Sequence, residues 1–480
     1  MSLEPVLVDV SDKVSVDAPL SLYLALRQRR YPYLLESVEK SGNRARFSFV
    51  GADPSALVTV KNRHLTMEFF NGGKEQMKER LSSCIDVQEE GSRLSGQIKE
   101  GFDIFDALRA SIPCQRCQDS NSFGRQVFFG GGIGYLAYDL VLERLGKRSC
   151  SSTPDAQFAV AESTFIFDHL TRKVYFAVAP IFPGAKTDLI EIIEGIDPED
   201  DEADELEGEL IGAGDADRYM KGVLRSKVHI MDGDIFQVVL ARSAKVRCTN
   251  PVGLYRRLRR INPSPYTYLF EFGGLSIVGA SPETLFCAHA GKLKVNPIAG
   301  TCPRGKNAAE DDALARAMLE DEKERAEHVM LVDLGRNDVR SVCRSGTVRV
   351  EEFMSVLRYS HVQHIETTVV GSLREECDQF DAARSVFPAG TLSGAPKLRA
   401  MEIIDELEEE PRGLYGGGIG YFSVDGSADF AIAIRSILLQ NDVATVQAGA
   451  GIVADSDPLR EYQETERKMA AMKRALGVAE

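Results

Sequence analysis

The stretch FFGGGIGYL at residues 128–136 returns almost unchanged as YGGGIGYF at residues 415–422. Neither copy fits the dinucleotide-binding pattern G-x-G-x-x-G, because Tyr421 stands where the third glycine of the second copy would be. Each copy also runs on into a strand-like segment, GYLAYD or GYFSVD, instead of opening a helix. Glycines in a strand permit close backbone approach. The repeat therefore predicts equivalent sheet positions in two lobes, with an internal duplication or a phosphate-binding loop as further possibilities.

The composition is that of a globular protein, with 44% hydrophobic and 27% charged residues among 480. No run of eighteen apolar residues occurs and the first residues lack the apolar core of a signal peptide, so we expect a cytoplasmic protein without a membrane span. The nine cysteines have no framework spacing, which favours reduced thiols. A net charge of −15 without a basic stripe argues against a nucleic-acid partner.

An acidic run divides the chain into two unequal parts. Residues 197–209 hold nine acids and no base, which is typical of a solvated linker. We therefore expect an N-terminal lobe at residues 1–196, a linker at 197–214 and a C-terminal domain at 215–480. Residues 155–180 predict a β-hairpin, and residues 414–452 alternate apolar residues and turns like an antiparallel meander.

Two pairs of glutamates have a spacing that could serve a metal. Glu324 and Glu327 stand three residues apart in a helical segment, and Glu461 and Glu464 repeat this spacing near the C-terminus, with Lys468 one turn later. Two facing carboxylate pairs would suit a hard divalent cation such as Mg²⁺. A solvated helix face with ion pairs is the more common reason for such spacing.

Other single residues carry weaker signals. Gly449 and Gly451 could offer backbone N–H groups to a carboxylate, or form a tight turn. Arg435 lies in an apolar, strand-like run, where a guanidinium needs a carboxylate partner. His364 is more typical of a core histidine, and Glu283, after a proline turn, of a buried acid or an edge residue.

Together these segments resemble the chorismate-utilising enzymes. The resemblance covers about residue 219 to the C-terminus and rests on ordered blocks: GDIFQVVLAR, SPETL, PIAGT, DEKERAEHVMLVDLGRND, AGTLSGAPK, GGGIGY, FAIAIRS, QAGAGIVADSDP and E-x-x-E-x-x-x-K. Residues 1–196 match more loosely, through YLLES and ARFSFVGADP. The resemblance implies an α+β fold, a two-lobed α/β sandwich whose large, mostly antiparallel sheets face each other with helices outside.

The resemblance also implies roles for matching residues. Glu324, Glu327, Glu461 and Glu464 look like a Mg²⁺ site that grips the ring carboxylate of chorismate. Glu283 resembles the general acid for the departing C4 hydroxyl, and His364 the histidine that assists loss of pyruvate, with Thr391 beside them in the pocket. The residues that resemble the family's substrate-binding groups are Thr301, Tyr421, Arg435, Gly449, Gly451 and Lys468.

Two positions discriminate between branches of the family. Water-adding members carry a lysine base where this chain has Gln237, so ammonia is the expected nucleophile. Ala299 in PIAGT resembles the anthranilate-forming branch, whereas the aminodeoxychorismate-forming branch typically has a lysine there. No glutaminase motif is present, so a separate glutamine amidotransferase subunit is implied. A non-catalytic chorismate- or tryptophan-binding regulator remains an alternative, although it predicts damaged metal or acid positions and these are intact.

The branch implies the first step of tryptophan biosynthesis, with feedback inhibition by tryptophan. The segment YLLES resembles one wall of the family's tryptophan pocket, and NPSPYTY the other. The predicted pocket residues are Leu35, Glu36, Ser37, Arg46, Pro265, Tyr266 and Thr267.

Overall fold

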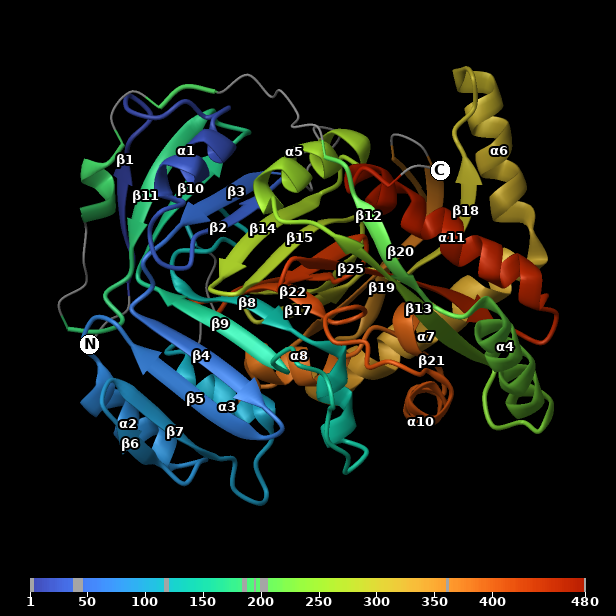
Figure 1. Ribbon diagram of the computed structural model, residues 1–480, viewed down its shortest axis with the longest axis horizontal. Helices are drawn as coiled ribbons and strands as arrows, with labels where there is room; N and C mark the ends of the chain where they lie inside the picture. The colour runs from blue at the N-terminus through green and yellow to red at the C-terminus, as the bar shows by residue number, and fades with distance from the viewer. Residues whose placement is uncertain are drawn as a thin grey trace.

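The computed structural model describes residues 4–37, 46–115, 121–183, 188–193, 196–198, 206–359 and 362–478. Two large sheets lie face to face in the middle of the molecule, with helices outside them (Figure 1). This confirms the predicted α+β sandwich. No helix in these ranges is long and apolar enough to cross a membrane.

The first sheet, sheet I, has twelve strands. Its order is β1 (Val6–Asp9), β11 (Lys173–Val178), β10 (Ser163–Asp168), β3 (Phe47–Gly51), β2 (Tyr33–Glu36), β14 (Tyr266–Phe272), β15 (Leu275–Ser281), β24 (Ser436–Gln440), β25 (Val443–Ile452), β13 (Gln237–Arg247) and β12 (Glu209–Ala213), with β21 (Gly394–Ala395) on β13.

The second sheet, sheet II, has thirteen strands. Its order is β18 (Ile298–Pro303), β20 (Val362–Ser372), β17 (Lys292–Val295), β16 (Thr284–His289), β23 (Ala428–Ile432), β22 (Gly418–Ser423), β8 (Gly131–Leu136), β9 (Ala156–Ala161), β4 (Ala56–Lys61), β5 (His64–Phe69), β7 (Arg93–Gln97) and β6 (Gln88–Glu90), with β19 (Arg349–Arg358) on β20.

The helices pack mainly outside the two sheets (Figure 1). They are α1 (Pro19–Leu26), α2 (Lys74–Ser82), α3 (Ile104–Ser111), α4 (Ala216–Met231), α5 (Pro251–Ile261), α6 (Ala308–Glu320), α7 (Glu322–Val342), α8 (Gln379–Val386), α9 (Gly390–Ser393), α10 (Lys397–Leu407) and α11 (Pro458–Ala475). Helices α1, α5 and α11 share an apolar core with the outer face of sheet I.

Aromatic side chains fill the space between the sheets. Phe49 of sheet I meets Tyr421 of sheet II edge to face, with ring centroids 5.4 Å apart. Tyr135 and Phe272 make a second, tilted ring contact across the same layer. Burial of such large rings is the main source of stability in a core, so the inner layer holds the two sheets together.

The sheets do not divide along the chain at the acidic run. Each sheet contains strands from both sides of it, and strands β2 and β14 pair directly. The predicted parts 1–196 and 215–480 are therefore interleaved and do not form separate sheets. Most of the acidic run, residues 199–205, lies outside the described residues.

The repeated glycine segments are neighbours in sheet II, which corrects the expectation that they lie in two lobes. Strands β8 and β22 pair antiparallel, with Gly134 directly opposite its counterpart Gly420. A Cβ on Gly134 would lie 2.0 Å from the carbonyl oxygen of Gln157, and one on Gly420 would lie 2.0 Å from that of Asp429. Only glycine fits at either position, so the repeat reflects one packing constraint that occurs twice.

An internal two-fold axis accounts for this arrangement. In sheet I, Leu34 of YLLE stands opposite Leu269 of YLFE, so these similar segments also meet across an axis. The order β11-β10-β3-β2 on one side mirrors β25-β24-β15-β14 on the other. The structure thus supports the internal duplication that the glycine repeat left open.

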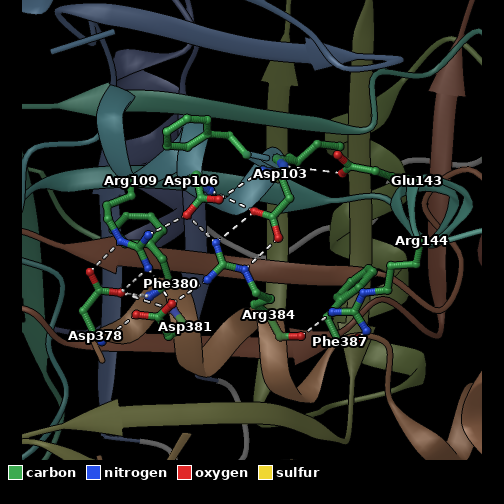
Figure 2. Close-up of polar contacts among 12 residues, drawn as sticks. Asp103, Asp106, Arg109, Glu143, Arg144, Asp378, Phe380, Asp381, Arg384 and Phe387 are labelled. Carbon is green, nitrogen blue, oxygen red and sulfur yellow. Dashed lines mark hydrogen bonds and ion pairs between the residues drawn. The ribbon is translucent and has the colours of Figure 1, made fainter. Parts of the chain in front are cut away.

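Helices α3 and α8 form a reciprocal ion-pair cluster across this axis (Figure 2). Both contain D-x-F-D-A-x-R, at residues 103–109 and 378–384. Arg384 binds Asp103 at 2.7 Å and Asp106 at 2.5 Å. In the same way, Arg109 binds the two aspartates of α8, at 2.8 and 2.7 Å. We call these six side chains the α3–α8 clasp.

Helices α1 and α5 exchange partners in the same manner. Arg27 and Tyr23 of α1 bind Glu271 of β14, at 2.8 Å for the arginine. The matching arginine of α5, Arg259, binds Glu36 of β2 at 2.7 Å. An arginine from each half of the chain therefore binds a glutamate of the other half. Together with the α3–α8 clasp, these ion pairs join the two halves on the outer sides of both sheets.

Candidate active site

Glu283 lies where the chain crosses from β15 in sheet I to β16 in sheet II. The hydroxyl of Thr391 donates a hydrogen bond to its Oε1 at 2.8 Å. Burial raises the pKa of Glu283 to about 7, although the Thr391 hydrogen bond and the nearby Lys468 charge oppose that rise. Near neutral pH this carboxyl group is therefore available as a proton donor.

The segment around α9, which carries Thr391, is fixed from both halves of the chain. Arg144, which follows β8 in the first half, donates to the backbone oxygen of Phe387 at 3.0 Å (Figure 2). Lys397 donates to the oxygen of Val386 at 3.0 Å and pairs with Asp338 of α7 at 2.7 Å. These bonds locate the Thr391 hydroxyl without direct contact to it.

Arg435 lies at the second crossing between the sheets, between β23 and β24, and not within a strand as expected. Its φ of 52° is unusual for a non-glycine residue. Burial lowers the pKa of Arg435. Its guanidinium donates to the backbone oxygen of Lys468 at 3.4 Å, and no carboxylate of the described chain pairs with it. A half-buried guanidinium without a carboxylate partner favours an anionic ligand.

Gly449 and Gly451 lie inside strand β25 and do not form the tight turn considered above. The Lys468 ammonium donates to the carbonyl oxygen of Gly449 at 2.9 Å. A Cβ on Gly451 would lie 2.6 Å from Nε2 of Gln237. Both glycines thus leave room for functional side chains from neighbouring elements.

Tyr421 does not join these residues, which corrects its predicted place beside the substrate. Its ring points into the layer between the sheets and packs on Phe49 and Phe128. Tyr415, the first residue of the same YGGGIGYF segment, lies at the site instead. Its hydroxyl would be 3.0 Å from a Cβ on Gly449. Tyr415 was not predicted, because both tyrosines belong to one motif and only the fold separates them.

His364 of β20 contacts the β18 segment that precedes α6. Its Nδ1 lies 2.8 Å from the carbonyl oxygen of Gly300 and 3.1 Å from the hydroxyl of Thr301. A carbonyl can only accept, so Nδ1 carries the proton and Nε2 is left as the basic nitrogen. Burial lowers the pKa of His364, so the neutral ring prevails at neutral pH.

The four predicted glutamates come from helices α7 and α11. Burial raises the pKa of Glu324, and the charges of Glu327 and Glu464 add to the rise. Burial also raises the pKa of Glu461, with a contribution from Glu464. The charges of the two glutamate pairs therefore interact with one another. The spacing in the sequence suggested two facing pairs but could not establish that they are close.

The four carboxylates are the type of ligand that a hard divalent cation prefers. All four are oxygen ligands, and their mutual repulsion would be relieved by a cation between the helices. Glu327 accepts a hydrogen bond from Gln237 at 2.9 Å, and Glu464 pairs with Lys468 at 2.8 Å. Within the described residues no three His, Cys, Asp or Glu side chains converge on one point. Binding of a cation would therefore involve rotation of these side chains.

A second pocket lies between the sheets, near the two-fold axis. Six of the seven predicted feedback residues line it, and the other lining residues are Phe47, Phe49, Arg125, Gln126, Tyr268, Ile419, Tyr421 and Asp429. Arg46 is absent from its lining and instead binds Asp168 at 2.7 Å. The Glu36 carboxylate is likewise engaged by Arg259. The prediction for Arg46 is therefore corrected, whereas Glu36 lines the pocket and also binds the scaffold.

Comparisons with known proteins agree with this geometry. A family model described as chorismate binding enzyme matches residues 115–474. Anthranilate synthase component 1 2 of Haloarcula marismortui is 45% identical, over 98% of this chain and 92% of that protein. Anthranilate synthase component 1 of Thermococcus kodakarensis is 44% identical, over 96% of this chain and 98% of that protein.

Solved structures give the same result. The crystal structure of anthranilate synthase component I from Streptococcus pneumoniae TIGR4 matches with a TM-score of 0.75 and 36% identity, covering 91% of this chain and 94% of that one. The menaquinone-specific isochorismate synthase of Escherichia coli has the same fold, with a TM-score of 0.70 at 18% identity over 98% of this chain and 94% of that one.

Proposed function

Because this chain belongs to the family of chorismate binding enzymes, we propose that it is the large subunit of an anthranilate synthase. It converts chorismate and ammonia to anthranilate, pyruvate and water. The observation that carries this proposal is that the crossings between the sheets hold a partly buried acid, Glu283, whose pKa is about 7, and a partly buried guanidinium, Arg435, that has no carboxylate partner in the described chain. The full-length relatives with the same name support the choice within the family.

The substrate is a dianion, and the site has cations for it. The Arg435 guanidinium lies against the backbone oxygen of Lys468, and the Lys468 ammonium lies against the backbone of Gly449. Tyr415 adds a hydroxyl at the same place. When bound at the four glutamates, Mg²⁺ would neutralise the ring carboxylate of chorismate.

In the first step, ammonia forms a bond to C2 of the ring and the C4–oxygen bond breaks. Glu283 gives its proton to the departing oxygen, which leaves as water. The Thr391 hydrogen bond holds the carboxyl group and stabilises the carboxylate that remains. Gln237 cannot act as a base that activates water, and its amide is engaged by Glu327, so neutral ammonia is the better nucleophile.

In the second step, the proton on C2 is lost and the enolpyruvyl C–O bond breaks, so that the ring becomes aromatic. The enolpyruvyl methylene gains a proton and leaves as pyruvate. The basic Nε2 of His364 is suited to move this proton, because its Nδ1 is fixed by Gly300.

Tryptophan is the proposed ligand of the pocket between the sheets. Its aromatic walls, Phe47, Phe49 and Tyr421, suit an indole ring. Arg125 and Asp429 provide charges of both signs in the same pocket, as a zwitterionic amino acid requires. Strands β2 and β14, which line the pocket, belong to different halves of the chain. A ligand in the pocket would therefore contact both halves and affect their relative position.

The test is a direct assay of the purified chain with chorismate, Mg²⁺ and an ammonium salt. Anthranilate fluorescence and pyruvate should rise together, EDTA should stop both, and tryptophan should lower the rate. Chorismate consumption without pyruvate would show that the product is an aminated or hydroxylated intermediate, which would contradict the proposed reaction.

A further inference from the structure

Arg412, in the segment between α10 and β22, is a charged side chain enclosed by the fold. Only 2% of the side chain is exposed, so it cannot contact a bound substrate. Its Nε and Nη2 donate to the two carboxylate oxygens of Glu408, at 2.8 and 2.6 Å. Nη1 donates to the backbone oxygen of Leu392 at 2.6 Å, and Nη2 to that of Val239 at 2.7 Å. The guanidinium therefore binds three separate segments of the chain.

The two backbone oxygens belong to elements that form the candidate active site. Leu392 directly follows Thr391 in α9, and the Thr391 hydroxyl donates to Glu283 at 2.8 Å. Val239 lies on β13, the strand that begins with the site's glutamine. Because the donors of a guanidinium point in fixed directions, Arg412 sets the position of α9 relative to β13.

Arg412 also fixes the turn that carries Tyr415. The backbone N–H of Tyr415 donates to the backbone oxygen of Arg412 at 3.2 Å, and Gln447 of β25 donates to the same oxygen at 2.9 Å. The ring of Tyr138, from the first half of the chain, has its centroid 4.4 Å from the guanidinium carbon. One residue thus connects α9, β13, β25 and the turn before β22.

The first half of the chain has a glutamine where the second half has Arg412. The segment QVFFGGGIGY (126–135) matches RGLYGGGIGY (412–421), so Gln126 is the equivalent residue. Gln126 donates to Asp429 at 3.0 Å. Packing of the repeated glycine strand therefore does not require an arginine at this position. Of the two equivalent positions, the arginine occupies the one in the half that carries Glu283.

We propose that Arg412 is a positioning residue for the general acid, because it holds α9 where the Thr391 hydroxyl binds Glu283. The inference rests on the proposed function, in which Glu283 gives its proton to the departing oxygen. Glu408 orients the guanidinium and is itself fixed, since its Oε1 accepts the backbone N–H of Ala241 on β13 at 2.7 Å. The pair thus transmits the position of β13 to the acid.

The groups around the Glu283 carboxyl give this role a measurable consequence. Burial raises the pKa of Glu283, the Thr391 hydrogen bond and the charge of Lys468 on α11 lower it, and the charge of Glu366 on β20 raises it. Among these groups, Thr391 is the one on the segment that Arg412 binds. Loss of Arg412 should therefore release the hydroxyl and raise the pKa of Glu283.

The test follows the Glu283 carboxyl in Arg412→Met. The infrared C=O band of the protonated carboxyl, identified as the band that Glu283→Gln removes, titrates without any substrate. Its midpoint should move to higher pH in Arg412→Met, by the same amount as in Thr391→Val. Adding Thr391→Val to Arg412→Met should move it no further, because both changes remove one hydrogen bond. With chorismate and ammonium, kcat should fall about 100-fold, as expected for a displaced catalytic group.

A second variant and a control separate positioning from stability. Arg412→Met leaves the Glu408 carboxylate buried without its cation, so Arg412→Met with Glu408→Gln, which removes both charges, is measured as well and should show the same shift. Arg27→Met breaks an arginine–glutamate pair on the outer side of sheet I. This control should lower Tm but leave kcat and the midpoint of the Glu283 band unchanged.

Two results would overturn the proposal. One is an unmoved midpoint in a folded Arg412 variant, and the other is a shift that adds in full to that of Thr391→Val, because Arg412 would then act on Glu283 by another route. If wild type makes no anthranilate from chorismate and ammonium, the proposed function fails. The infrared titration still decides in that case whether Arg412 holds the Thr391 hydroxyl on Glu283.

Discussion

Glu283 and Ser55 occupy matching positions in the two halves of the chain, within VGASPETL (278–285) and VGADPSAL (50–57). Both lie where the chain crosses from sheet I to sheet II. The Ser55 hydroxyl is bound to Glu162 inside the fold, whereas Glu283 receives the Thr391 hydroxyl. The duplication therefore supplies two equivalent crossings, of which only the second carries the acid used in the proposed reaction.

The Thr391 hydroxyl lowers the pKa of Glu283, and a variant without the hydroxyl should reveal this effect. At a fixed concentration of unprotonated ammonia, kcat/KM for chorismate should fall as pH rises through about 7, because the acid form of Glu283 is lost. The Thr391 hydrogen bond lowers the pKa of Glu283, so Thr391→Val should move this decline to higher pH. Thr391→Ser keeps the hydroxyl and should keep the wild-type profile. A decline that does not move in Thr391→Val would show that another group governs it.

Glu461 should contribute to the affinity for Mg²⁺. Replacing a ligand carboxylate by an amide removes a charge, so Glu461→Gln should raise the Mg²⁺ concentration for half-maximal activity by about 10–100-fold. The rise in Tm that Mg²⁺ gives the wild type should shrink in the variant, as ligand linkage requires. Glu322→Gln, at the exposed start of α7, is the control and should change neither. Equal Mg²⁺ responses in both variants would remove Glu461 from the site.

At the scale of helices and strands, sequence patterns predicted most elements that carry the site. Glutamates at i and i+3 do lie on helices α7 and α11, and His364 does lie on a strand. Periodicity could not place Arg435, because the expected meander leaves sheet II after β23 and enters sheet I at β24. Periodicity could not separate Tyr415 from Tyr421 either, since Tyr415 lies in the turn before β22 and Tyr421 lies within that strand.

The α3–α8 clasp joins the two halves and should contribute measurably to stability. Arg384→Ala removes the cation that binds Asp103 and leaves Asp106 and Asp381 with Arg109 alone. We expect a loss of about 2–4 kcal/mol in the free energy of unfolding, below the value for a fully buried pair because the Arg384 side chain is 29% exposed. Urea unfolding measures this loss. Arg336→Ala, which breaks an exposed pair with Asp333 within α7, should cost less than about 1 kcal/mol.

The same clasp predicts a loss of stability in acid. Burial alone would raise the pKa of Asp103, but the hydrogen bond and charge of Arg384 outweigh it and lower the pKa. The pKa of Asp378 is lowered by Arg109 in the same way. A lowered carboxyl pKa stabilises the fold above the unfolded-state pKa, and this contribution is lost as pH falls through the folded-state pKa. Arg384→Ala should therefore flatten the acid dependence of the urea midpoint.

At the scale of the whole molecule, the two halves are built into common sheets. The acidic run predicted two successive parts, and the fold class was predicted correctly, but the interleaving was not visible in sequence. Pairing of β2 with β14 and of β8 with β22 joins segments more than two hundred residues apart, and no local pattern encodes such pairings. The repeats YLLE/YLFE and GGGIGY were signals of the duplication, and the structure shows how they meet.

This architecture predicts how a divided chain behaves. A break between Asp201 and Glu202 in the acidic run should give two pieces that do not fold alone, because each would expose unpaired strand edges in both sheets. Co-expressed pieces should purify together and unfold in one cooperative transition. A soluble, cooperatively unfolding C-terminal piece on its own would contradict the interleaved description.

The central claim is that one site, with Glu283 as its acid, turns chorismate and ammonia into anthranilate and pyruvate. Its most direct test is the mass spectrum of the products formed from chorismate, Mg²⁺ and ¹⁵N-ammonium by wild type and by Glu283→Gln. We expect singly ¹⁵N-labelled anthranilate with equimolar pyruvate from wild type, and a rate lowered about 100-fold or more in the variant. An unlabelled or pyruvate-retaining product from wild type, or an unchanged rate in the variant, would contradict it.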